Sequence, residues 1–178
     1  MPKLCFTILG CGSSGGVPRL GGHWGDCDPE NIKNRRRRCS LLVEKISSKG
    51  TTSLLIDTSP DLRDQLLDAN IGVLDGIIYT HFHADHVHGI DDLRMIAFNM
   101  KKRLPVWADS DTGINLKARF AYAFEQTTES AYPPILDLNL INSNFDVSGP
   151  GGNILCEPFL VNHGNINALG YKIGPLAY

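Results

Sequence analysis

The feature that most constrains this chain is a cluster of histidines directly after a short apolar run. The segment Thr80-His-Phe-His-Ala-Asp-His-Val-His88 holds four of the chain's six histidines. Residues 76–79 before it are typical of a buried strand. Side chains at i and i+2 of a strand end point the same way, so His81 and His83 are predicted to bind one ion. A fold with this cluster must place a strand end beside an open cavity.

Two further residues extend the cluster toward a second ion. Asp85 and His86 lie where the chain turns toward the next helix, so they place a carboxylate and an imidazole across the cavity from the first pair. Two ions about 3.5–4 Å apart fit such an arrangement and share one bridging hydroxide. A lone histidine is most often an ordinary core or surface residue, but this density of ligand types favours a metal site.

Strands and helices alternate along the chain, which predicts a mixed α/β fold. Two apolar runs joined by a polar stretch predict a hairpin over residues 39–57. Ser59 and Pro60 are typical of a helix start. A four-residue spacing of apolar side chains predicts a helix over residues 114–124. Other strands are expected at residues 4–9, 76–80, 104–108, 154–162 and 169–173, with a helix from residue 89 and a long loop from residue 10 to residue 38.

Composition narrows the class of protein. Hydrophobic residues make up 42% of the 178 residues, which suits one domain with a core. The formal net charge of −2 gives no general attraction to nucleic acid or to anionic membranes. No apolar run approaches the roughly 20 residues of a membrane span, and the five scattered cysteines form no Cys-x-x-Cys pair. We expect a cytoplasmic protein with neither a membrane nor a nucleic-acid partner.

The run His81-x-His83-x-Asp85-His86 after an apolar strand resembles the signature of the metallo-β-lactamase superfamily. Other segments extend the resemblance to its PhnP-like branch, which contains phosphodiesterases acting on phosphoribosyl cyclic phosphate. These segments are Gly10-Cys-Gly-Ser-Ser-Gly-Gly-Val-Pro18, Trp24-Gly-Asp-Cys-Asp-Pro29, Asn34-Arg-Arg-Arg-Arg38, Asp57-Thr-Ser-Pro-Asp61, Gly89-Ile-Asp-Asp-Leu-Arg94 and His163-Gly164. The fold that this resemblance implies is an αββα sandwich.

The resemblance also implies a role for each ligand residue. His81, His83 and His163 would hold the first ion, whereas Asp85 and His86 would contribute to the second. Asp85 would also orient the metal-bound water and so act in catalysis. Three imidazoles leave an open coordination position, where the pKa of a bound water drops to near 7. Imidazole and carboxylate ligands suit several divalent metals, and zinc or manganese is the cofactor expected here.

The sequence departs from the family pattern after His163. The family continues with an aspartate that bridges the two ions and with a later histidine for the second ion, but residues 164–178 contain neither residue type. We therefore expect residues 1–178 to form a single metallo-β-lactamase-like domain without its C-terminal portion, so that the sandwich is incomplete. One bound ion is expected in place of the family's two. The resemblance also implies a homodimer.

Three residues outside the ligand set are further candidates. Asp57 ends a buried strand and is expected to accept the N–H of a ligand histidine, the alternative being a turn aspartate that caps the next helix. Arg94, about one helical turn beyond the cluster, is a candidate for substrate binding, the alternative being an ion pair with Asp91 or Asp92. His88 is a candidate substrate-binding proton donor or, alternatively, a solvent-facing helix residue.

Two other motifs have competing interpretations. The one dense basic patch is Arg35–Arg38, with Lys33 and Arg19 nearby, and it is either an exposed surface or a phosphate-attracting rim beside the cleft. Gly10-x-Gly12-x-x-Gly15 matches the dinucleotide-binding fingerprint literally. However, Gly16 and Pro18 prevent the helix that this fingerprint needs, so a tight loop near the metal cleft is expected instead.

The leading hypothesis is a metal-dependent phosphodiesterase of the PhnP-like type that acts on a small cyclic or nucleotide-like phosphodiester through a metal-bound hydroxide. One alternative is another hydrolase of the superfamily, such as an RNA-processing nuclease or a thioesterase. The other is an inactive metal-binding fragment. Hydrolysis of an aryl phosphodiester that disappears in His83→Ala would favour the first hypothesis.

Overall fold

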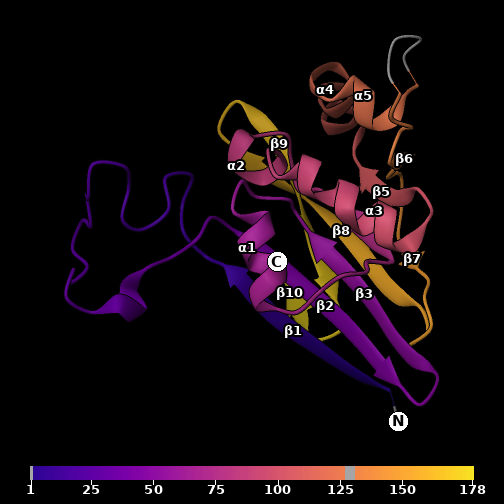
Figure 1. Cartoon of the computed structure of the whole chain (residues 1–178), viewed down its shortest axis with the longest axis horizontal. Helices are drawn as coiled ribbons and strands as arrows, with labels where there is room; N and C mark the ends of the chain where they lie inside the picture. Colours follow the sequence, from indigo (N-terminus) through magenta and orange to yellow (C-terminus); the bar gives the residue numbers. More distant parts are fainter. Residues whose placement is uncertain (1, 127–130) are drawn as a thin grey trace.

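The computed structural model describes residues 2–126 and 131–178, which form three layers (Figure 1). Helices α1 (Leu62–Asp68) and α3 (Leu93–Met100) cover one face of a six-stranded sheet, and a four-stranded sheet packs against the other face. The mixed α/β class predicted from the sequence is confirmed. The first sheet contains, in spatial order, β1 (Lys3–Gly10), β2 (Ser40–Ser47), β3 (Gly50–Ile56), β4 (Gly76–Ile78), β5 (Leu104–Ala108) and β6 (Leu136–Leu140), and the second contains β10 (Leu176–Ala177), β9 (Ile166–Ile173), β8 (Ile154–His163) and β7 (Phe145–Val147).

The strand directions in the first sheet determine where functional side chains gather. Strands β1, β2 and β3 are antiparallel, so the hairpin predicted over residues 39–57 is confirmed. Strands β3 to β6 are parallel. Because parallel strands end at the same edge of a sheet, the residues after β3 and β4 meet there. Asp57 follows β3, and Thr80 and His81 follow β4.

The central strands are apolar on both faces because each face meets a different core. Leu55 and Ile77 pack beneath the helices, whereas Ile56 and Ile78 pack against the second sheet. All four side chains are fully buried. Burial on both faces explains why these strands appear in the sequence as continuous apolar runs without alternation.

Residues 11–38, between β1 and β2, form an arm that extends away from the layered body (Figure 1). The long loop predicted there is confirmed, with one short 3-10 helix, η1 (Ile32–Asn34). The arm begins with a close backbone approach, since Gly12 N donates to Arg37 O at 2.8 Å and a Cβ on Gly10 would lie 2.0 Å from Arg38 O. These glycines therefore allow two backbone segments to pack closely, which agrees with the tight loop expected here in place of a dinucleotide site.

The basic patch is largely engaged within the protein. Arg38 binds Asp61 through its backbone N–H, its Nε and its terminal nitrogen, at 2.8, 2.8 and 2.5 Å. Arg37 forms an ion pair with Asp68 at 2.8 Å, and the Arg35 guanidinium lies 5.5 Å from the centre of the Trp24 ring. The contacts of Arg37 and Arg38 join the arm to α1, and that of Arg35 lies within the arm. Together they favour a structural role over a phosphate-attracting rim.

Replacing Asp61 with asparagine is expected to lower the free energy of unfolding by about 1–2 kcal/mol at neutral pH, because the pair is partly buried and charge-assisted. Hydrogen bonding to Arg38 lowers the pKa of Asp61 in the folded protein. Because the pKa of Asp61 is lower in the folded protein than the value of about 3.9 in the unfolded chain, its ionisation stabilises the fold at any pH above about 3.9. This contribution is lost as the pH falls through the pKa of the folded protein. Urea denaturation at several pH values checks this: the difference between wild type and variant should shrink below about pH 4. A difference independent of pH would contradict it.

The region before β6 departs from the sequence prediction. One helix was expected over residues 114–124, but the chain forms α4 (Ser110–Arg119) and α5 (Ala121–Phe124) with a break at Phe120, where φ is −127° and ψ is 39°. The Phe120 side chain packs against the main core, which favours the break. Helix α4 also begins earlier than expected, because the Asp109 carboxylate accepts the N–H of Thr112 at 2.8 Å and caps the helix.

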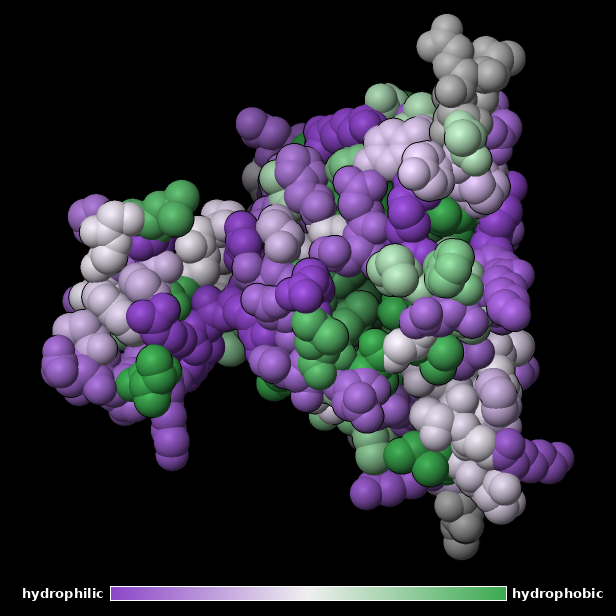
Figure 2. Space-filling model, in the orientation of Figure 1, coloured by the Kyte–Doolittle hydropathy of each residue, from purple (hydrophilic) through white to green (hydrophobic). Residues whose placement is uncertain are grey.

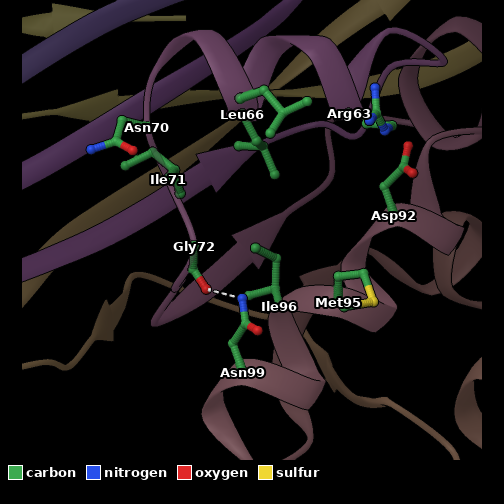
Figure 3. A pocket seen from close by; sticks show the side chains of 10 residues that line it. Arg63, Leu66, Asn70, Ile71, Gly72, Asp92, Met95, Ile96 and Asn99 are labelled. Carbon is green, nitrogen blue, oxygen red and sulfur yellow. Dashed lines mark hydrogen bonds between the residues drawn. The ribbon is translucent and has the colours of Figure 1, made fainter.

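A cavity of about 410 Å³ lies between α1 and α3 (Figure 3). Leu66, Ile71 and Ile96 line it, and Asn99 Nδ2 donates to Gly72 O at 3.1 Å across one end. Hydrophobic side chains gather around this hollow on the surface (Figure 2). None of the clustered histidines lines it, so it is separate from the candidate metal site. Within residues 2–126 and 131–178, the helices are all too short or too polar to cross a bilayer.

Candidate metal centre

Three histidines from two sheets meet at one edge of the sandwich. His81 and His83 precede the short helix α2 (Ala84–Val87), and His163 ends β8. One ligand atom from each ring lies within 4.8 Å of the others. The ring centroids of His81 and His163 are 4.8 Å apart. The structure therefore brings together the three residues that the resemblance assigned to a first ion.

The donor atoms of His81 and His83 are spaced as two ligands of a tetrahedral metal ion would be. His81 Nε2 and His83 Nδ1 are 3.2 Å apart. Two nitrogens each about 2.0–2.1 Å from a tetrahedral zinc ion are separated by about 3.3 Å. His83 and His163 are exposed whereas His81 is only 5% exposed, so the cluster opens to solvent on one side. This arrangement leaves room for a water or a substrate oxygen at a fourth position.

The electrostatics of His81 also suit a ligand. Burial, together with the neighbouring His86, His83 and His163, lowers the pKa of His81 to about 3. The ring is therefore neutral at physiological pH, which is the form that binds a metal ion.

His86 lies beside this cluster in a more negative environment. Its Nδ1 is 2.7 Å from Asp57 Oδ2, and its Nε2 is 3.5 Å from Asp85 Oδ2 and 3.5 Å from Cys39 Sγ. Burial lowers the pKa of His86, but the hydrogen bonds with Asp57 and Cys39 outweigh it and raise this pKa to about 10. The same negative charges that favour a proton on this ring favour a metal cation beside it. The ligand-type atoms that lie within 4.8 Å of one another around His86 come from Cys39 and Asp57, and Asp85, expected at a second site, is not among them.

Asp57 is fully buried and accepts three hydrogen bonds. Its Oδ1 accepts the backbone N–H of Thr80 at 2.8 Å, and its Oδ2 accepts the Thr80 hydroxyl at 2.8 Å as well as the His86 Nδ1–H. Its backbone lies in the left-handed region with φ of 60°, which aspartate tolerates better than most residues. The contact with a histidine predicted for Asp57 is present. The alternative, a cap on the following helix, is not, since Asp61 occupies that position.

The two candidate substrate residues each contact an aromatic ring. The Arg94 guanidinium lies 5.6 Å from the centre of the Tyr132 ring, and the expected alternative partner Asp91 instead accepts the Tyr122 hydroxyl at 2.6 Å. The exposed His88 ring packs edge-on against Phe120, with centroids 5.7 Å apart.

Arg119 is a residue near the centre that sequence reasoning missed. It comes from the end of α4, donates to Phe82 O at 2.7 Å and lies over the Phe82 ring at 5.4 Å. Phe82 stands between His81 and His83 in the chain, so this contact brings a cation to the edge of the histidine loop. The only sequence signal was a basic residue at a helix end, which is too common to single out.

A second cavity, of about 300 Å³, adjoins the histidine loop. It lies between α4 and the turn joining β8 to β9, immediately beyond His163. Its walls combine three amides, one carboxylate and three apolar side chains. These residues are Phe82, Asp111, Ile114, Asn115, Asn165, Ile166 and Asn167.

Comparison with known proteins agrees with this geometry. The family model described as the beta-lactamase superfamily domain matches residues 52–177. The solved structure of a new diphosphatase from the PhnP family is 33% identical to this chain, with a TM-score of 0.81, and the match covers 100% of this chain and 65% of that one. Zinc-bound PqqB from Methylobacterium extorquens shares the fold, with a TM-score of 0.63, 17% identity, and coverage of 99% of this chain and 63% of that one.

A curated relative shows how much longer related proteins are. An octanoyltransferase from Porphyromonas gingivalis is 37% identical over 171 residues, which make up 96% of this chain and 33% of that protein. The chain therefore spans one third of the length of this relative and less than two thirds of the PhnP-family diphosphatase chain.

Proposed function

Because the chain belongs to the beta-lactamase superfamily and has the metallo-β-lactamase fold, we propose that it is a metal-dependent hydrolase of the PhnP-like type that cleaves a small phosphodiester. The observation that carries this proposal is the cluster of His81, His83 and His163, in which the facing nitrogens of the first two are 3.2 Å apart. The PhnP-family neighbour is described as a diphosphatase, which supports a substrate with a phosphoryl group.

In this proposal the chain's residues hold the ion and the reacting water. Zinc or manganese held by His81, His83 and His163 would supply a water of lowered pKa and neutralise charge that develops on the phosphoryl oxygens. Asp85 is the base proposed to orient that water and accept its proton, because its carboxylate lies beside His86 at 3.5 Å and only 17% of its side chain is exposed.

The body of the substrate would lie in the second cavity. Its three amides offer both donors and acceptors, and Asp111 adds an acceptor for hydroxyl groups. Phe82 and two isoleucines supply flat apolar walls. Arg119, which packs on Phe82, would contribute positive charge toward a phosphate oxygen. This lining suits a neutral, hydroxylated or ring-shaped group attached to the phosphate, such as the sugar of a nucleotide-like phosphodiester.

The test is turnover of bis(4-nitrophenyl) phosphate by the purified 178-residue chain loaded with zinc or with manganese. We expect release of nitrophenolate that requires the ion, stops on addition of a chelator and disappears in His83→Ala. His23→Ala, which removes an exposed histidine from the arm, is the matched control and should keep the wild-type rate.

Aryl thioester and lactone substrates, assayed in parallel, separate this function from its alternatives. Turnover of either without phosphodiester cleavage would assign a thioesterase or lactonase type of chemistry and contradict the proposal. Loaded protein that cleaves none of the three would contradict it too, and would favour a metal-binding fragment.

A further inference from the structure

The Thr80 hydroxyl lies at the meeting point of the two groups of candidate ligands. It is buried at 7% exposure, immediately before His81. Its Oγ1 is 2.8 Å from Asp57 Oδ2, 2.9 Å from His81 Nδ1 and 3.2 Å from His86 Nδ1. One hydroxyl therefore contacts a buried carboxylate and two histidines assigned to different ions.

Proton counting determines the direction of each hydrogen bond. The Thr80 hydroxyl has a single proton, which it donates to Asp57 Oδ2. His86 Nδ1 is nearer to the same oxygen, at 2.7 Å, and donates its proton there. The lone pairs of Thr80 Oγ1 are then left to accept the Nδ1–H of His81.

We propose that Thr80 is a positioning residue through which Asp57 fixes the tautomer of His81, while Asp57 orients the His86 ring by direct contact. With Nδ1 carrying the proton, the Nε2 atom of His81 is free to bind a metal ion, whereas an ion bound at His86 Nε2 would displace the second proton of that ring. His81 Nε2 is the atom that faces His83 Nδ1 at 3.2 Å. The relay, meaning the hydrogen bonds from His81 to Thr80 and from Thr80 to Asp57, therefore orients Nε2 toward the first site. The inference rests on the proposed function only in taking His81 and His86 as metal ligands.

Removing the hydroxyl without changing the shape tests this role. In Thr80→Val the His81 Nδ1–H loses its acceptor, so the ring is free to rotate or to adopt the Nε2–H tautomer, which cannot bind a metal through that atom. We expect zinc affinity, measured by competition with a chromogenic chelator, to fall about 10–100-fold, as for other partners that hold a ligand histidine. Thr80→Ser restores the hydroxyl and should stay within about 3-fold of wild type.

Thr58→Val is the matched control for the loss of a buried threonine hydroxyl. Thr58 is fully buried, and its Oγ1 contacts the Tyr79 hydroxyl at 3.1 Å and the backbone oxygen of Val87 at 3.3 Å. The variant should lose stability without a comparable loss of zinc affinity. Equal affinity losses in Thr58→Val and Thr80→Val, or no rescue by serine, would overturn the proposal.

The tautomer of His81 in the metal-free protein is a second measurement, and a change in folding stability alone does not alter it. Long-range nitrogen–proton correlation NMR distinguishes Nδ1–H from Nε2–H rings. Wild type and Thr80→Ser should show His81 as the Nδ1–H form, and Thr80→Val should shift it toward Nε2–H. An Nε2–H form of His81 in wild type overturns the proposal even if Thr80→Val does not fold. Neither measurement uses hydrolysis, so a failure of the proposed activity is distinguishable from a failure of this relay.

Discussion

Replacing His163 with alanine is expected to lower zinc affinity by at least about 100-fold, and with it the metal-dependent hydrolysis. Loss of a residue that merely orients a ligand costs about 10–100-fold in affinity, and loss of a direct ligand lies at or above that range. His163 is the one member of the three-histidine cluster that comes from the second sheet, so the variant leaves only the two histidines of residues 81–83. Isothermal titration calorimetry with zinc on the metal-free protein measures the change.

The His163 substitution also separates the effect on zinc binding from any effect on folding stability. Its side chain is exposed, so alanine there should change the free energy of unfolding of the metal-free protein by no more than about 0.5 kcal/mol. His23→Ala, in the arm, should change neither quantity. Unaltered zinc affinity in His163→Ala would show that the ion is held elsewhere, and the candidate centre would then be wrong.

Replacing Gly89 with alanine is expected to destabilise the fold by about 3 kcal/mol, the upper end of the usual cost of overpacking. An added Cβ would lie 2.0 Å from Ser59 O and 2.8 Å from Leu62 Cβ, and a backbone oxygen cannot move aside as a flexible side chain does. Gly89 N also donates to Thr58 O at 2.9 Å, so the clash forces the segment after β3, which carries Asp57, away from the segment that follows α2, the helix that contains His86.

Gly72→Ala is the matched control for this substitution. The nearest atom to an added Cβ there is Asn99 Nδ2 at 3.6 Å, which is ordinary contact. Denaturant unfolding should place this variant within about 0.5 kcal/mol of wild type. If Gly89→Ala is equally stable, the close packing of these two segments is not a feature of the folded protein.

The elements predicted correctly from the sequence are those whose apolar pattern is strong and local. The β2–β3 hairpin and β5 fall where apolar runs flanked by polar residues placed them. The strand predicted over residues 76–80 ends at Ile78. Tyr79 N still donates to Trp107 O of β5, whereas Thr80 O accepts from Leu169 N of the second sheet. Strand β6 was missed although its sequence, Leu-Asp-Leu-Asn-Leu, alternates between apolar and polar residues as a half-buried strand does.

For the candidate site too, the local pattern predicted the residues that are close together in the sequence, and not those brought in by the fold. Four of the five expected ligands are neighbours in the sequence, so their grouping is visible before any fold is known. His163 lies about 80 residues away and was assigned only through the family resemblance. Contacts made by Cys39, Thr80 and Arg119 depend on how the strands and α4 pack, and each is an ordinary residue type in its local sequence. Pattern reasoning has no signal for such tertiary contacts.

Two hydrogen bonds connect the two sheets at the residues that immediately precede His81. Leu169 N donates to Thr80 O at 2.8 Å, and the Tyr171 hydroxyl donates to Tyr79 O at 2.7 Å. An ion held by His81 and His163 would act as a reversible cross-link between the same two sheets. Its binding would then be thermodynamically linked to their separation: each ten-fold rise in free zinc above the dissociation constant would add about 1.4 kcal/mol to the resistance of the sandwich to opening. The free energy needed to separate the two sheets would thus depend on the concentration of free zinc around the protein.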